Sequence, residues 1–477
     1  MITPQETVGL LPPAFDPDYI DHAVKPYLCN GEYLGERPAL PLIDLALSKE
    51  NAAPPHFWGM LNDGWTPDPE QGTSVFIQAY DKRGPDNERK KIYASATTPD
   101  LYPARYAGKT RRFLTQLFAD ANAGQPLMHQ YYADYFDLYW NLHLGVTGEA
   151  IPAEVRQIGA SFTAVLGHWF PTLEIVRANI MRVRELRKPL KEWIDSRVQA
   201  VIDGDVPDPD RTFVHYWLTN GGQGEHFRRR DIVFECFHNF LAFSQWGNML
   251  YQTMTLLDAD RGDHQVRSWF ARTMTGSPDA AQGGPFTPLD RFVMELFRTI
   301  SPNGGSISTT ETVRGLDSRS AMVLTPHPAT SRDPRHWPNP EEFDPDRYRA
   351  APTSADNDEA RSRAAGLARC PYRPAAFAVT DGRHAQLTNS AFGAVYGMVD
   401  DTAYPVCDTA GYAPFGFGYR RCAGEHLTVE FFKDVLRTVW AGGIEFHTLD
   451  LEPPERLPVA PRTVIDDNVG FRRRAAR

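Results

Sequence analysis

The hydrophobic and polar positions of this chain follow a helical period over most of its length after the first hundred or so residues. In 173–203, charged residues are interleaved with Leu, Ile and Val at spacings of three and four, which predicts an exposed amphipathic helix. Pro189 lies inside this stretch and predicts a break or a new first turn. The stretch 230–257 has no proline and is apolar on every side, so it predicts one buried helix about 40 Å long at the centre of the fold.

Two more helices and an irregular first part complete the predicted secondary structure. Helical patterns occupy 291–299 and the residues from just after Cys422 to about Trp440. Residues 1–100 are rich in Pro and Gly and predict loops with short strands, for example over 74–80. The expected fold class is therefore mainly α with a small β region, built largely from the N-terminal part.

Composition narrows the class of protein. With 477 residues and 42% hydrophobic residues, and with no linker or repeat in the sequence, we expect one large domain over 1–477. The formal net charge of -10 disfavours nucleic acid as a partner, because neutralising phosphates requires clustered Lys and Arg. The sequence contains neither a leader pattern nor a run of about 18 apolar residues. We therefore expect a soluble, cytoplasmic protein without a membrane anchor.

Cysteine chemistry is expected from a single residue. The five cysteines form an odd set without a Cys-x-x-Cys pair, which indicates neither a disulfide framework nor a zinc site. Cys422 follows a glycine-rich loop and directly precedes a predicted helix, whose N-terminus would stabilise a thiolate, the form that binds metals. Glycines at 416, 418 and 424 would let this loop turn tightly against a large flat group. A buried structural cysteine is the alternative.

The pattern around Cys422 resembles the heme-binding loop of the cytochrome P450 family at each of its fixed positions. The resemblance implies the heme-thiolate fold of that family, a heme b cofactor and Cys422 as the proximal ligand of its iron. It also implies that Arg420 pairs with a heme propionate and that the aromatic residue and the glycines shape the pocket. The cofactor-binding residues implied by this loop are Phe415, Gly416, Gly418, Arg420, Cys422 and Gly424.

Other segments stand in the order that the family requires. Glu295 and Arg298 are similar to its Glu-x-x-Arg pair, and Arg347 lies in a segment similar to the one that supplies a third partner. The resemblance implies a structural ion-pair network of these three residues beneath the heme; an ordinary surface pair is the alternative for the first two. Arg111 is a further candidate for binding a propionate, and a solvated basic face is its alternative.

The central helix departs from the family. Monooxygenases of the family place an acid and a threonine there to relay protons, whereas this chain has Gln245 and Trp246, preceded by Ser244. These three residues are the candidate catalytic residues. The same stretch is similar to that of the allene oxide synthase and hydroperoxide lyase branch, whose substrate brings its own O–O bond. A helix register shifted by one turn is the other explanation.

The segment 349–409 is a second departure, because it is longer than the corresponding segment of the family. The resemblance puts this insertion near the thiolate side, where electron donors dock, so it would reshape or replace that surface; a solvent loop without function is the alternative.

Three functions follow from these observations. The first is monooxygenation of a hydrophobic small molecule, with a ferredoxin or a flavoprotein as electron donor. The second is an O2-independent reaction, either rearrangement of a hydroperoxide or oxidation driven by peroxide. The third is a heme-binding protein without turnover.

Overall fold

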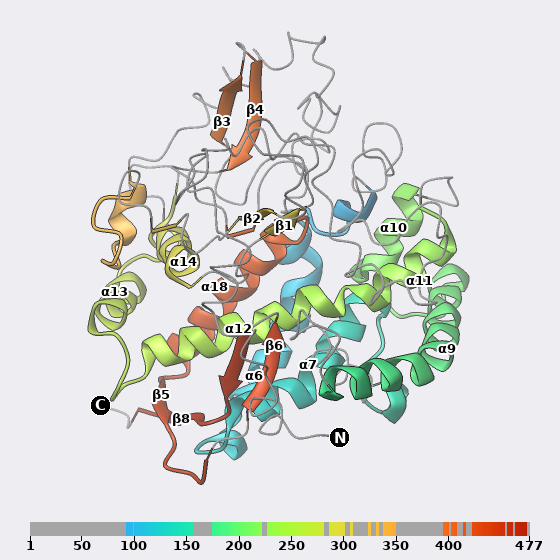
Figure 1. Ribbon diagram of the computed structural model, residues 1–477, viewed down its shortest axis with the longest axis horizontal. Helices are drawn as coiled ribbons and strands as arrows, with labels where there is room; N and C mark the ends of the chain where they lie inside the picture. Colours follow the sequence, from blue (N-terminus) through green and yellow to red (C-terminus); the bar gives the residue numbers. More distant parts are fainter. Residues whose placement is uncertain are drawn as a thin grey trace.

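The computed structural model describes a mainly helical protein (Figure 1). It covers residues 92–98, 100–155, 174–221, 227–280, 286–300, 306–308, 323–325, 331–332, 337–349, 395–399, 402–407, 414–415, 422–453, 456–460 and 463–474. The longer helices among these residues are α6 (Ala107–Leu117), α7 (Leu127–Leu144), α9 (Glu174–Asp203), α10 (Phe213–Gly221), α11 (Arg229–His238), α12 (Phe240–Leu257), α13 (His264–Thr275), α14 (Pro288–Thr299) and α18 (Glu425–Ala441).

The described strands form four separate antiparallel pairs. These pairs are β1 (Ser306–Ser308) with β2 (Val323–Thr325), β3 (Val395–Val399) with β4 (Thr402–Cys407), β5 (Ile444–Thr448) with β8 (Val469–Arg473), and β6 (Arg456–Ala460) with β7 (Thr463–Asp466). All of them follow residue 305, whereas the predicted strand at 74–80 and most of residues 1–100 lie outside the described residues. The predicted fold class, mainly α with a small β region, is confirmed.

The core is built around α12 and α18. Helix α12 crosses the middle of the molecule in Figure 1 and packs against α7 and α13, while α18 packs against α6 and α14. Aromatic side chains join the two helices, because the ring of Trp246 on α12 stacks on Phe431 of α18 with centroids 4.2 Å apart. The central helix and this C-terminal helix are therefore in contact in the core through aromatic side chains.

Helix α9 forms where the pattern predicts it, but the predicted break at Pro189 is wrong. The helix continues through this proline to Asp203. A proline removes one hydrogen bond of the helix, but the turns that follow are held by burial of Leu190, Ile194 and Val198, which share one face. Lys188 and Lys191 stay exposed on the other face, as the amphipathic pattern predicts.

The predicted helix 230–257 exists as two helices, so the prediction of one continuous helix is wrong at Asn239. This residue is the C-cap of α11 and the N-cap of α12. Its side chain is 3% exposed and makes two tertiary hydrogen bonds, to Tyr93 and His143. A polar side chain that is hydrogen-bonded to distant residues favours an interruption of the regular helix at its own position. The expected apolar burial is present on both sides of it, for example at Phe237 and Phe243.

The two other predicted helices are confirmed. Helix α14 begins three residues earlier than its pattern suggests, because Thr287 and Asp290 form a capping box that places Pro288 at the first helical position. Helix α18 ends at Ala441, close to the predicted Trp440.

Within the insertion 349–409, the structure describes Arg349 and the β3–β4 hairpin. None of the described helices is both long enough and apolar enough to cross a membrane.

Candidate active site

Cys422 stands at the start of α18 in a tight turn. Its backbone N–H donates to the carbonyl of Phe415 at 2.9 Å, which closes the loop between these two residues. Its Sγ accepts a hydrogen bond from the N–H of Gly424 at 3.3 Å, one residue before the helix begins. An N–H donor and the positive end of a helix dipole both stabilise a sulfur anion. The turn is therefore suited to a thiolate that binds a metal.

Aromatic contacts fix this loop against two helices. The Phe415 ring packs edge-on against Phe297 of α14 at 5.2 Å, and Phe297 in turn contacts Phe432 of α18 at 5.6 Å. All three rings are buried. The remaining residues of the predicted heme-binding loop, Gly416, Gly418 and Arg420, lie outside the described residues.

Glu295, Arg298 and Arg347 are brought together in a buried network. The carboxylate of Glu295 forms a bidentate pair with Arg298, in which both N···O distances are 2.8 Å. It also accepts hydrogen bonds from Arg347 Nε at 3.1 Å, from the Tyr348 hydroxyl at 3.0 Å and from the backbone N–H of Asp344 at 2.8 Å. The side chains of Glu295 and Arg298 are fully buried. One carboxylate thus organises α14 and the segment that ends in the short helix Pro345–Tyr348.

The arginines of this network also hold the backbone. Arg298 donates to the carbonyl oxygens of Ser331, Pro340 and Glu342 at 2.7–3.0 Å. Burial by itself lowers the pKa of Arg298, but its hydrogen bonds and charge interaction with Glu295 outweigh burial and raise that pKa above its usual value. The guanidinium is therefore charged at every accessible pH and serves as a fixed connector between distant segments.

The candidate catalytic residues of the central helix have different surroundings. Trp246 is 4% exposed, and its indole Nε1 donates to the hydroxyl of Thr428 on α18 at 3.0 Å. Gln245 is half-buried, and its Oε1 has no partner among the described residues. The backbone of Ser244 belongs to α12, but its side chain lies outside the described part of the structure. Trp246 is therefore part of the α12–α18 contact.

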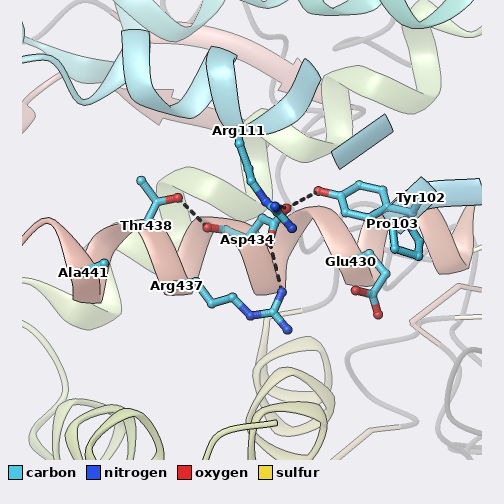
Figure 2. A pocket seen from close by; sticks show the side chains of 8 residues that line it. All are labelled: Tyr102, Pro103, Arg111, Glu430, Asp434, Arg437, Thr438 and Ala441. Atoms are coloured by element: carbon cyan, nitrogen blue, oxygen red, sulfur yellow. Dashed lines mark hydrogen bonds and ion pairs between the residues drawn. The ribbon is translucent and has the colours of Figure 1, made fainter. Parts of the chain in front are cut away.

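Arg111 lies beside α18 rather than at the Cys422 turn. Its Nε forms an ion pair with Asp434 at 3.1 Å, and 62% of its side chain is exposed. Asp434, which is buried, also accepts from the Tyr102 hydroxyl at 2.9 Å and from Arg437 at 3.0 Å, as Figure 2 shows. These residues line a pocket of about 400 Å³ together with Pro103, Glu430, Thr438 and Ala441. The contact with a propionate stays a prediction, and the observed role of Arg111 is to join α6 to α18.

The sequence analysis did not single out Tyr93, His143 and Asn239, which form a polar chain beside the α11–α12 junction; His143 and Asn239 are buried and Tyr93 is partly buried. The sequence does offer a signal at Asn239, because an amide side chain inside an apolar segment indicates a hydrogen bond to a distant residue. Tyr93 and His143 carried no such signal.

Comparison with known proteins gives the fold. No protein-family profile and no curated protein matches the chain. A solved zebra fish cytochrome P450 structure with progesterone is similar with a TM-score of 0.59 at 15% identity, over 97% of this chain and 100% of the other. A cytochrome P450DA heme domain reaches 0.56 at 16% identity, over 87% and 82%. A retinoic-acid-bound cyanobacterial CYP120A1 reaches 0.54 at 16% identity, over 85% and 82%. The chain therefore has the cytochrome P450 fold.

Proposed function

We propose that this protein is a heme-thiolate oxidoreductase in which Cys422 is the axial ligand of a heme b iron. The observation that carries the proposal is the Cys422 turn, where a sulfur at a helix start accepts the N–H of Gly424 on a cytochrome P450 fold. A soft thiolate stabilised in this way suits a heme iron. Arg420 would pair with a propionate, and Phe415 would help to shape the pocket.

Each part of the site has a task in this reaction. When bound, the heme supplies the redox chemistry, and the thiolate donates electron density that favours cleavage of an O–O bond. The N–H of Gly424 would stabilise the sulfur as a thiolate, and the Phe415 carbonyl fixes the turn through the backbone of Cys422. The Glu295 network fixes the segment that ends at Tyr348 against α14.

The reaction proposed first is monooxygenation of a hydrophobic small molecule. It requires O2 and two electrons from NAD(P)H, delivered through a ferredoxin or a flavoprotein. The test is product formation from apolar substrates with reductant, donor and O2 present, compared with the same mixture without O2. Loss of product in the mixture without O2 supports this reaction, and unchanged product formation there refutes it.

The second candidate is an O2-independent reaction of a hydroperoxide or of H2O2. It is favoured by the central helix, because neither Gln245 nor Trp246 can supply the carboxylate and hydroxyl that relay protons. In this reading a fatty-acid hydroperoxide is converted anaerobically and without reductant. If neither assay gives product and the protein still binds heme, the third reading, a heme-binding protein without turnover, replaces both.

A further inference from the structure

The backbone N–H that faces the Cys422 sulfur belongs to the peptide group between Ala423 and Gly424. This N–H, on Gly424, lies 3.3 Å from Sγ and donates to it. The carbonyl oxygen of the same peptide group belongs to Ala423 and accepts a hydrogen bond from the Thr97 hydroxyl at 2.6 Å. A hydroxyl and the sulfur are therefore bonded to the two ends of one planar, conjugated peptide group.

Thr97 is held in this position by the segment 92–98. Its side chain is buried, and the carbonyl of the preceding residue, Ala96, accepts a hydrogen bond from the Tyr106 hydroxyl at 2.8 Å. The Thr97 hydroxyl has a single proton, and Ala94, the second carbonyl within its reach, is more distant, at 3.3 Å. The proton is therefore directed to the peptide group beside the sulfur.

A hydrogen bond that a peptide carbonyl accepts makes the N–H of the same peptide group a stronger donor. It draws electron density along the conjugated C–N bond and leaves the N–H proton more positive. Such cooperativity strengthens the next hydrogen bond by about 10–30%. The Thr428 hydroxyl also bonds in this turn, 2.9 Å from the Gly424 carbonyl, but that carbonyl belongs to the next peptide group. Thr97 therefore acts on the peptide group that faces the sulfur, and Thr428 does not.

We propose that Thr97 is a positioning residue for the axial sulfur: through the peptide group between Ala423 and Gly424, its hydroxyl strengthens the hydrogen bond to Cys422 and raises the reduction potential of the heme iron. Hydrogen bonds to a coordinating sulfur withdraw electron density from the metal. Reduction adds one negative charge to the iron–sulfur unit, so a stronger N–H donor favours the reduced state. The inference rests on the proposed function and deepens it.

The experiment measures the midpoint potential of the ferric–ferrous couple in the purified holoprotein by spectroelectrochemistry. Thr97→Val keeps the shape of the side chain and removes its hydroxyl. The equilibrium should shift about two- to threefold toward the ferric form, because the N–H donor is weakened. This shift is a fall of about 20–30 mV, since a tenfold change in a one-electron couple corresponds to about 59 mV. In the same variant, the C–O stretch of the reduced CO complex should move to lower frequency, because the sulfur donates more electron density.

Two further variants separate this effect from a structural one. Thr97→Ser keeps a hydroxyl and should restore the potential and the C–O stretch of the wild type. Thr253→Val is the matched control, because Thr253 is also buried and donates to a carbonyl, that of Met249 within α12, at 2.7 Å. It should leave both quantities unchanged. A loosened turn that admitted water to the sulfur would raise the potential instead, since water stabilises the added negative charge.

Each other result overturns the inference. If Thr97→Val fails to take up heme, Thr97→Ala, which also lacks the hydroxyl, is measured in its place with the same expectation. A potential that stays constant or rises in the variant without the hydroxyl would contradict the assigned role, as would a fall that Thr97→Ser does not reverse. Loss of heme in both Thr97→Val and Thr97→Ala would leave Thr97 a structural role only. The proposed function would survive these results, whereas it would fail first if the wild type lacked a thiolate-type spectrum.

Discussion

Replacing Glu295 by Gln tests whether the buried network holds the fold together. The substitution keeps the size of the side chain and removes its charge. Arg298 then retains its guanidinium in a fully buried position, and Arg347, whose side chain is 11% exposed, loses the same partner. The amide oxygen can still accept some of the hydrogen bonds, so the main loss is the countercharge.

The size of the expected loss in the free energy of unfolding follows from the burial of the Glu295–Arg298 ion pair. Removing one partner of a buried ion pair costs about 3–5 kcal/mol, and the retained hydrogen bonds put this variant near the lower value. Total stabilities are about 5–15 kcal/mol, so the loss is a large fraction of the free energy of unfolding. With a urea dependence of about 3 kcal/mol per molar, the midpoint of unfolding should fall by about 1 M.

Tryptophan fluorescence during urea unfolding measures this change. The signal sums the ten tryptophans of the chain and so follows global unfolding; one of them, Trp337, is buried and lies 5.5 Å from the guanidinium of Arg298. Arg349→Gln is the matched control, because its ion pair with Asp346 is on the surface, where such pairs contribute about 0–1 kcal/mol. If Glu295→Gln and Arg349→Gln unfolded at the same urea concentration, the network would not carry the stability assigned to it.

Three further predictions concern the thiolate, the buried histidine and the helix interface. Cys422→Ala should lose the red-shifted Soret band that an axial thiolate gives to the reduced CO complex; a retained band in its optical spectrum would exclude this ligand. His143 has a pKa of about 3 in the folded state and near 6.5 when unfolded, so the unfolded state binds the extra proton as the pH falls from 6.5 toward 3. Stability should therefore fall over that range by up to about 1.4 kcal/mol per pH unit in urea titrations, and His143→Gln should flatten the slope. Gly247→Ala should lower the free energy of unfolding by about 1–3 kcal/mol, since a Cβ would clash with the Tyr132 hydroxyl, whereas Gly108→Ala, with open space around it, should not; thermal unfolding of the two variants measures the difference.

Sequence reasoning succeeded where one local pattern determines the outcome. The period of apolar residues locates α14, although the Thr287–Asp290 cap that sets its first residue was not recognised, and the same helix places Glu295 and Arg298 one turn apart. The turn at Cys422 and the helix that follows it were likewise predicted from neighbouring residues, because both are local. These features depend on residues within a few positions of one another.

The features that escaped prediction depend on contacts between distant segments. The break at Asn239 reflects bonds to Tyr93 and His143, which are 146 and 96 residues away. The hydrogen bond from Trp246 to Thr428, 182 residues further on, was likewise not predicted. Periodicity specifies which residues are buried and not which partners they meet.

Helix α18 is held by contacts to three other parts of the fold. The Cys422 turn directly precedes it, Thr428 in its first turn accepts the indole N–H of Trp246, and Asp434, near its middle, pairs with Arg111. All three contacts are made by the polypeptide alone. The placement of the Cys422 sulfur is therefore determined by contacts within the protein along this helix.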